Sequence, residues 1–325
     1  MTISMRALAA AVGVSVGTVS RALKHQGGVS PETRQRVFQQ AAALGYDLGR
    51  LEPAPLRKVL FLLHSQHTRS SAVPFYSAVE QGARDVCTPM GIELQPFAVK
   101  PSSSIRRQLL LQEADAILAV GFLEPETLAI AQALGKPMTL IDSSAPGLPS
   151  VNPDNLAGTQ ALTAQLLAQG YQRIAFLCGS LAHYSIRLRE RGYRQALFNA
   201  GRLADPALER LIPPGLDLAA GVQHVLRQWL AGINPPDAII AYNDACALEV
   251  LRQLRSHGIR VPQQIAVAGF DNIPSAADAG LTTVAVDQAA LGISGMRQLL
   301  ELARHQATRD SLHAVRVLQR ASTSR

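Results

Sequence analysis

Apolar and polar positions alternate regularly over most of the chain. From residue 58 onward, short continuous apolar runs are separated by longer stretches in which apolar residues recur every three to four positions. Short apolar runs are typical of strands buried on both faces of a sheet, whereas the longer stretches are typical of amphipathic helices. The expected strands are V-L-F-L-L (59–63), I-E-L-Q-P-F (92–97), A-I-L-A-V (116–120), M-T-L-I (138–141), I-A-F-L (174–177), A-I-I-A-Y (238–242) and I-A-V-A-G-F (265–270).

The helical stretches between these runs predict an α/β fold in which helices cover both faces of parallel sheets. The number of strand–helix units, and a natural division near Val151–Gly158, predict two lobes. Ligands of open α/β sheets bind at the carboxyl ends of strands, so we expect a ligand site in the cleft between the lobes. The clearest helical stretches are Phe75–Met90, Leu156–Gln169, Ile186–Ala200, Leu218–Leu230 and Ala245–His257.

The N-terminal segment has a different pattern, that of two short helices around a tight turn. Leu8 and Val12 lie four positions apart on one face of the first helix, and Gly13 supplies a residue that tolerates positive φ. Ser15 is a suitable N-cap for a second helix over Val16–Leu23. This arrangement predicts a helix-turn-helix, whose second helix enters the major groove of DNA.

Five residues of the second helix are left to face outward once its apolar side is buried. Among them, the planar guanidinium of Arg21 suits bidentate contact with a guanine, and Val16 suits a thymine methyl group. The alternative is an ordinary helical hairpin with a solvated arginine. With the capping residue, the predicted DNA-binding set is Ser15, Val16, Gly17, Thr18, Ser20 and Arg21.

The positive charge is concentrated beside these helices. The 325 residues carry a net charge of +7, and residues 1–58 hold eight Lys and Arg against three Asp and Glu. The remaining residues hold 23 against 21, so the basic surplus lies where a phosphate-binding surface requires it. A charged stretch alone indicates only a solvated surface; its coincidence with a helix-turn-helix favours DNA binding.

The cysteines and the hydropathy indicate a cytosolic protein. Cys87, Cys178 and Cys246 are far apart and lack zinc-binding spacing, so we expect buried thiols and no metal. The short apolar run near the N-terminus is better explained by a capped helix than by a signal peptide. No stretch approaches the roughly 18 apolar residues of a membrane span, so no membrane partner is expected.

Several motifs resemble the LacI/GalR family of transcriptional repressors. At the N-terminus these are T-V-S-R-A-L, V-S-P-E-T-R and A-A-A-L-G-Y; farther on they are A-I-I-A-Y-N-D, H-G-I-R-V-P-Q-Q-I-A-V-A-G-F-D-N-I-P and L-T-T-V. The resemblance extends over nearly the whole chain. It implies a small all-α helix-turn-helix headpiece followed by a two-lobed domain with the type I periplasmic-binding-protein fold.

The resemblance also implies the domain limits. The headpiece is expected at 1–46, a hinge at 47–58 and the effector-binding and dimerisation domain at 59–325. The chain would cross between the lobes three times. The N-lobe would comprise about 59–157 and 286–310, and the C-lobe about 158–285 and 311–325.

In the family, a hinge helix inserts a leucine into the minor groove at the centre of the operator and bends the duplex. Leu51 and Leu56 are the candidates in this chain. The linker is several residues short, however, and Pro53 and Pro55 would end a helix begun at Asp47. A semi-rigid spacer is the alternative.

The resemblance assigns an arginine after strand 174–177 to gripping the effector, and Arg189 is the expected one among three neighbouring arginines. Asp271, at a strand end, can accept from two hydroxyl groups, or it can cap the turn that follows. In the pair after strand 238–242, Asn243 is expected to contact the effector while Asp244 caps the next helix.

Aromatic residues near the start of the first lobe helix complete the expected site. Phe75 and Tyr76 either stack on an apolar face of the effector or fill the core. Asp142 ends a strand and is a weaker candidate. The pair Asp154–Asn155 is an equally weak candidate. His64 and His183 could reach the cleft, but a lone histidine is more often structural.

Motifs of hydrolases, metalloproteases and nucleotide-binding enzymes are missing, so we expect no enzyme and no cofactor. We expect a ligand-responsive repressor that binds a pseudo-palindromic operator as a homodimer. The arginine, carboxylates and amide around an aromatic favour a sugar or sugar acid as effector, although a purine remains open. The alternatives are a sensor that binds no specific DNA and, less favoured, a carbohydrate-acting enzyme.

Overall fold

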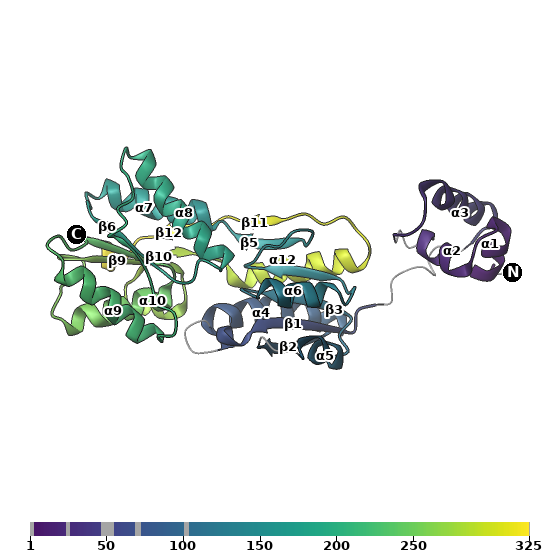
Figure 1. Cartoon of the computed structure of the whole chain (residues 1–325), viewed down its shortest axis with the longest axis horizontal. Coiled ribbons are helices and arrows are strands. Elements are labelled where there is room, and N and C mark those ends of the chain that lie inside the picture. Colours follow the sequence, from purple (N-terminus) through teal and green to yellow (C-terminus); the bar gives the residue numbers. More distant parts are fainter. Residues whose placement is uncertain (1–2, 24–26, 47–54, 69–72, 101–103, 325) are drawn as a thin grey trace. The chain divides into compact units, whose positions relative to one another are not determined.

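A computed structural model describes residues 3–23, 27–46, 55–68, 73–100 and 104–324 (Figure 1). The first of its two compact units contains three helices: α1 (Met5–Val12), α2 (Val16–Leu23) and α3 (Pro31–Ala43). Serine side chains cap all three, at Ser4, Ser15 and Ser30. Gly13 adopts φ +76° and ends α1, as the turn of a helix-turn-helix requires.

The headpiece has its own apolar core. It contains one fully buried residue from each helix: Leu8, Val19 and Val37. Arg36 of α3 donates from Nη2 to the carbonyl oxygen of Val12 at 2.8 Å, which satisfies a group that the end of α1 leaves open. The positions and ends of the two helices predicted from the sequence are confirmed.

The second unit contains two six-stranded sheets. The first has the order β11-β5-β4-β3-β1-β2, and all its neighbouring strands are parallel. Its strands are β1 (Lys58–His64), β2 (Glu93–Val99), β3 (Ala116–Val120), β4 (Met138–Ile141), β5 (Ser150–Pro153) and β11 (Ser311–His313).

The second sheet has the order β12-β10-β9-β8-β6-β7 and is parallel except for β12, which pairs antiparallel with β10. The last strand of the chain, β12, therefore lies at the edge of this sheet and runs opposite to its one neighbour. Its strands are β6 (Ile174–Cys178), β7 (Glu209–Leu211), β8 (Ala238–Ala241), β9 (Ala266–Asp271), β10 (Thr282–Ala285) and β12 (Arg316–Leu318).

Helices accompany both sheets, which confirms the predicted α/β class. The three cysteines are free and buried, as expected. In the described part of the chain, no helix is long and apolar enough to cross a membrane. The helices are α4 (Val73–Cys87), α5 (Ile105–Leu111), α6 (Pro125–Gln132), α7 (Asn155–Ala168), α8 (Tyr184–Asn199), α9 (Leu218–Ala231), α10 (Asp244–Ser256), α11 (Pro274–Asp278) and α12 (Gln288–Ala303); short 3-10 turns lie at 65–68, 88–90 and 321–323.

The chain passes between the two sheets three times, as the resemblance implied. The crossings lead from β5 to α7, from β10 to α12 and from β11 to β12. The last crossing follows His313, a few residues beyond the expected 310, because β11 still pairs with β5. Only two residues separate β11 from β12, so one extended segment serves both sheets.

Helices α4 and α12 touch backbone to backbone. A Cβ atom built on Gly292 would lie 1.9 Å from the carbonyl oxygen of Val79, and one built on Gly82 would lie 2.0 Å from that of Ala289. Real Cβ atoms do not approach an oxygen so closely, so each glycine permits the crossing by lacking a side chain. The two helices therefore pack as one unit.

We expect Gly292→Ala to separate α4 from α12 and to lower the free energy of unfolding by about 1–3 kcal/mol, the usual cost of overpacking a tight core. For a domain of this size, that loss corresponds to a fall in Tm of about 2–4 °C per kcal/mol. Gly232→Ala is the matched control, because its Cβ would make only ordinary contacts of 3.4 Å or more. Equal Tm values for the two variants would contradict the close crossing.

Candidate functional site

The predicted DNA-binding residues lie on the side of α2 that faces away from the headpiece core. Val16 is 40% exposed. Gly17 and Arg21 are also exposed, while Thr18 and Ser20 are half-buried. Ser15 Oγ accepts from the backbone N–H of Thr18 at 3.0 Å, which fixes the start of the helix.

Arg21 is held close to its own helix. Its Nε donates to the carbonyl oxygen of Gly17 at 3.2 Å, one turn earlier. This contact leaves the two Nη groups, the part of the fork that suits a guanine edge, at the exposed end of the side chain. Of the two hinge candidates, Leu56 is half-buried and directly precedes the backbone amides of Arg57 and Lys58, which donate to Asp115. Leu51 lies outside the described residues.

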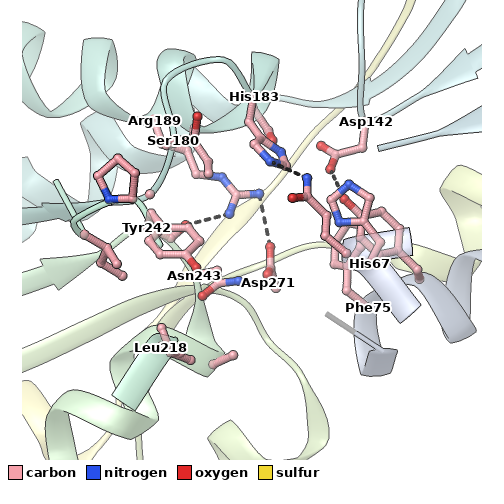
Figure 2. Close-up of a pocket in the computed structure, with 18 of the residues that line it drawn as sticks. His67, Phe75, Asp142, Ser180, His183, Arg189, Leu218, Tyr242, Asn243 and Asp271 are labelled. Atoms are coloured by element: carbon pink, nitrogen blue, oxygen red, sulfur yellow. Dashed lines mark hydrogen bonds and ion pairs between the residues drawn. The ribbon is translucent and has the colours of Figure 1, made fainter. Parts of the chain in front are cut away.

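A pocket of about 410 Å³ contains the predicted effector residues of the larger unit. Figure 2 shows that side chains from both lobes point into it: His67, Phe75 and Asp142 from the lobe of the first sheet, and Arg189 and Asp271 from the lobe of the second. The pocket also contains Asn243 and Tyr76. The fold therefore brings all six predicted effector residues, which come from different parts of the sequence, to one pocket. They lie at the carboxyl ends of strands and near the starts of helices.

Arg189 is the central side chain of the pocket (Figure 2). It is 4% exposed, and its Nε donates to Asn155 Oδ1 at 2.8 Å. Nη1 donates to the carbonyl oxygen of Tyr242 at 2.7 Å, and Nη2 donates to Asp271 Oδ1 at 3.1 Å. The guanidinium also lies 3.8 Å from the ring centre of Phe270. Every nitrogen of the fork is therefore engaged in positioning the site.

Asp271 ends β9 with its backbone at φ +112°, a conformation that few residues other than glycine adopt. Its carbonyl oxygen accepts from Nε2 of Gln288 at 2.5 Å, and its carboxylate pairs with Arg189. Burial raises the pKa of Asp271 to about 8, an effect larger than the lowering by Arg189. The carboxyl group of Asp271 therefore holds its proton to a higher pH than an exposed carboxyl group does.

Asp142 occupies the corresponding strand end of the first sheet. Its Oδ2 accepts from the hydroxyl group of Tyr76 at 3.1 Å, and its backbone has φ +54°. Burial raises the pKa of Asp142, with Arg189 acting in the opposite direction. Tyr76 therefore acts as a hydrogen-bond donor, whereas the sequence predicted either stacking on the effector or filling of the core. Phe75 packs edge-on against Tyr76 and also lines the pocket, so it serves core and site together.

The roles expected of Asn243 and Asp244 are wrong in one respect. Asn243, not Asp244, caps α10: its Oδ1 accepts from the N–H of Cys246 at 2.9 Å. Asp244 is fully buried, and its two oxygens accept from Thr283 Oγ1 at 2.6 Å and from the N–H of Ile273 at 2.9 Å. Burial raises the pKa of Asp244 to about 7. Asn243 still lines the pocket, whereas Asp244 supports the loop beneath it.

Histidines form one wall of the pocket. His67, not singled out in the sequence, accepts at Nε2 from the N–H of Phe122, and its ring lies edge-on to His183 at 5.4 Å between centroids. Gln66 Nε2 lies 3.3 Å from His183 Nε2. Burial lowers the pKa of His67 to about 3 and that of His183 to about 4. Both rings are therefore neutral near pH 7.

The remaining candidates have supporting roles. His64 does not line the pocket and lies 3.0 Å from Glu124. Asp154 caps α7, and Asn155 receives the bond from Arg189 described above. No group of histidine, cysteine and acidic residues in the described part of the chain is arranged to hold a metal ion. Residues that the sequence did not indicate include Gln66, His67, Ser180, Ser185, Pro213, Leu218 and Tyr242.

We expect Arg189→Lys to lower the free energy of unfolding by about 1–3 kcal/mol, because an ammonium group cannot serve Asn155, Tyr242 and Asp271 together. Arg191→Lys is the control, since Arg191 is exposed on the same helix and such substitutions change stability by about 0.5 kcal/mol or less. Urea unfolding of both variants provides the measurement. Equal losses would show that Arg189 has no special position.

We also expect the effector domain to lose stability as the pH falls from 6.5 towards 4. The pKa of His183 is lowered in the folded state, so over this range the unfolded chain binds the additional proton. His183→Gln should reduce the loss between pH 7 and pH 5 by about 1–2 kcal/mol. His224→Gln, on an exposed side chain of α9, should keep the wild-type slope. An unchanged slope in His183→Gln would contradict this assignment.

Comparisons with known proteins agree with both parts of the structure. Residues 4–47 match the family model of bacterial regulatory proteins of the lacI family, and residues 163–323 match that of the periplasmic binding protein-like domain. The repressor CytR of Escherichia coli K12 is 28% identical over 315 residues, covering 92% of this chain and 89% of that protein. The regulator GntR of Pseudomonas aeruginosa is 29% identical over 323 residues, covering 95% and 91%.

Solved structures give the same result over the full length. The regulator CelR in its complex with cellobiose has a TM-score of 0.72 and 26% identity, covering 98% of this chain and 99% of that chain. The lac repressor dimer bound to operator and the anti-inducer ONPF has a TM-score of 0.70 and 26% identity, covering all of both chains. These relatives are regulators, which confirms that the chain is not an enzyme. The chain therefore combines a lacI-family helix-turn-helix domain with a periplasmic-binding-protein-like domain, and over nearly its full length it is similar to transcriptional regulators of the LacI family.

Proposed function

We propose that this regulator is a repressor that binds a pseudo-palindromic operator as a homodimer in the cytoplasm, under the control of a small sugar or sugar acid. The observation that carries the effector half of the proposal is the pocket in which Asp142 of one sheet faces Arg189 and Asp271 of the other. A ligand that touches both strand ends favours one angle between the lobes over others. Such a preference is what couples a small-molecule site to a distant DNA site.

The DNA half of the proposal rests on α2 and on the basic headpiece. The outward residues Val16, Gly17 and Arg21 are exposed at the start and centre of that helix, where base edges are contacted in helix-turn-helix proteins. Two copies related by a two-fold axis would read two half-sites. The similarity to the lac repressor, whose solved structure is a dimer on its operator, supports this arrangement.

The effector class follows from the chemistry of the pocket. Carboxylates and an amide accept and donate hydrogen bonds to hydroxyl groups, while Phe75 and Tyr242 offer flat apolar faces. The similarity to CelR, solved with cellobiose, supports a carbohydrate. We assign residues 1–46 to the headpiece, 47–58 to the hinge and 59–325 to effector binding and dimerisation. Leu51 and Leu56 stay the candidates for a leucine that enters the minor groove.

The test is selection of genomic fragments by the purified full-length protein at physiological salt, with and without pooled sugars and sugar acids. One enriched pseudo-palindromic site, altered in occupancy by the pool, is the expected result. Diffuse binding that weakens steeply with salt and ignores the pool would overturn the specific-repressor proposal. If the selected site responds only to a separate pool of purines, the repressor proposal stands and its effector class changes.

Arg21→Ala should weaken binding to the selected operator by about 1–3 kcal/mol and relax the base preference at one position of each half-site, because a bidentate contact to guanine is lost. Fluorescence anisotropy with single-base operator variants provides the measurement. Arg191→Ala removes the same charge from the effector domain and should leave operator affinity unchanged. A uniform loss at every base position would assign Arg21 to phosphate contact instead.

A further inference from the structure

Building on the proposed function, we propose that the effector is an uncharged molecule rich in hydroxyl groups, not an acid, and that Asp142 and Asp271 hold it by accepting its hydroxyl hydrogens. This choice separates the two effector classes, sugar and sugar acid, that the residue types alone leave open. It concerns the same pocket and rests on its hydrogen-bonding capacity and its charges.

The first observation is an unsatisfied oxygen of Asp142. The residue is 6% exposed, and its Oδ2 receives the hydroxyl hydrogen of Tyr76. Its Oδ1 is buried without a hydrogen-bond partner, although Ser185 lies near enough to the carboxyl group to lower its pKa. A buried carboxylate oxygen without a hydrogen-bond donor is energetically costly, so a donor from a ligand would stabilise it. Because Asp142 lines the pocket, a ligand hydroxyl group meets that need and a ligand carboxylate does not.

The second observation is the balance of charge. Among the described residues that line the pocket, Arg189 is the sole arginine or lysine, and all three of its nitrogens already donate to protein oxygens. His67 and His183 are neutral, because burial lowers the pKa of each. At a pH where Asp142 and Asp271 are ionised, an acidic ligand would therefore add a third negative charge, and Arg189, already paired with Asp271, is the one cation among the described lining residues.

The third observation is an apolar part of the pocket lining. Ile212, Pro213, Pro214 and Leu218 line the second-sheet side of the pocket. Leu218 begins α9 and is drawn among the pocket side chains in Figure 2. Such a surface suits the C–H faces of a sugar ring and offers no donor to a carboxylate. The pocket thus combines hydrogen-bond acceptors from both sheets with an apolar surface.

The pH dependence of binding distinguishes the two classes by its sign. Burial raises the pKa of Asp142 and Asp271. The titratable groups that interact with them are Tyr76, Tyr184, Arg189, Tyr242 and Asp244. Hydroxyl donors favour the ionised carboxylates, so a neutral ligand binds more tightly as the pH rises from 6 to 8. An acid favours the protonated carboxyls and binds less tightly over the same range.

The experiment is titration calorimetry of the full-length protein at pH 6, 7 and 8 with matched pairs of probes. The pairs are glucose with gluconate and glucuronate, galactose with galacturonate, ribose with ribonate, and cellobiose with cellobionate. We expect a neutral member to bind, and its acid to bind at least tenfold more weakly at pH 8, which equals about 1.4 kcal/mol. The affinity of the neutral member should rise with pH.

Asp142→Asn tests the residue itself. It keeps the shape of the side chain and removes its charge, so the preference for the neutral member should shrink at least threefold while the apolar wall is unchanged. Asp85→Asn is the control, because Asp85 is exposed on α4, makes the same change in net charge and does not line the pocket. An unchanged preference in Asp142→Asn would overturn the role assigned to Asp142.

The remaining outcomes separate the two proposals. An acid that binds more tightly than its neutral partner would overturn the present inference and leave the sugar-controlled repressor intact. Binding of no probe would overturn the inference and also the carbohydrate effector of the proposed function. Operator binding is measured separately by fragment selection, so neither result depends on it.

Discussion

The guanidinium of Arg189 lies buried among three segments that are far apart in the sequence. It joins the start of α7 at Asn155, the end of β8 at Tyr242 and the end of β9 at Asp271. Water cannot replace these partners in a buried site, and losing one partner of a buried ion pair costs about 3–5 kcal/mol. Arg189 therefore holds these three segments beside one another at the pocket.

A continuous series of contacts leads from Asp271 to Asp142. The carbonyl oxygen of Asp271 accepts a hydrogen bond from Gln288, the first residue of α12. Helix α12 in turn crosses α4 where Gly292 contacts Val79. Near the start of α4, Tyr76 donates to Asp142. The two pocket carboxylates are thus the ends of one packed path rather than independent groups. Because the backbones of α4 and α12 are in contact, these helices cannot slide past one another without losing their packing.

The architecture followed from the sequence because its signals are local. Apolar runs of four to six residues marked most strands, and the Gly13–Ser15 turn marked the headpiece, since these patterns depend on neighbours in the chain. Partnerships between distant side chains have no such signal. Nothing in the letters around Asn243 and Asp244 indicates which of them caps α10, because the answer depends on Thr283 and Ile273. His67 was missed for the same reason: its neighbours Phe122 and His183 come from two other segments.

The two strand-end aspartates share an unusual backbone as well as a pocket. Asp142 and Asp271 both adopt positive φ, which costs about 1–3 kcal/mol for a residue other than glycine and persists only where surrounding contacts impose it. Those contacts are Tyr76 for the first and Arg189 with Gln288 for the second. Glycine would relieve the strain at either position but would remove the carboxylate. The chain therefore adopts positive φ at the ends of two strands, at +54° for Asp142 and +112° for Asp271, and both carboxylates line one pocket.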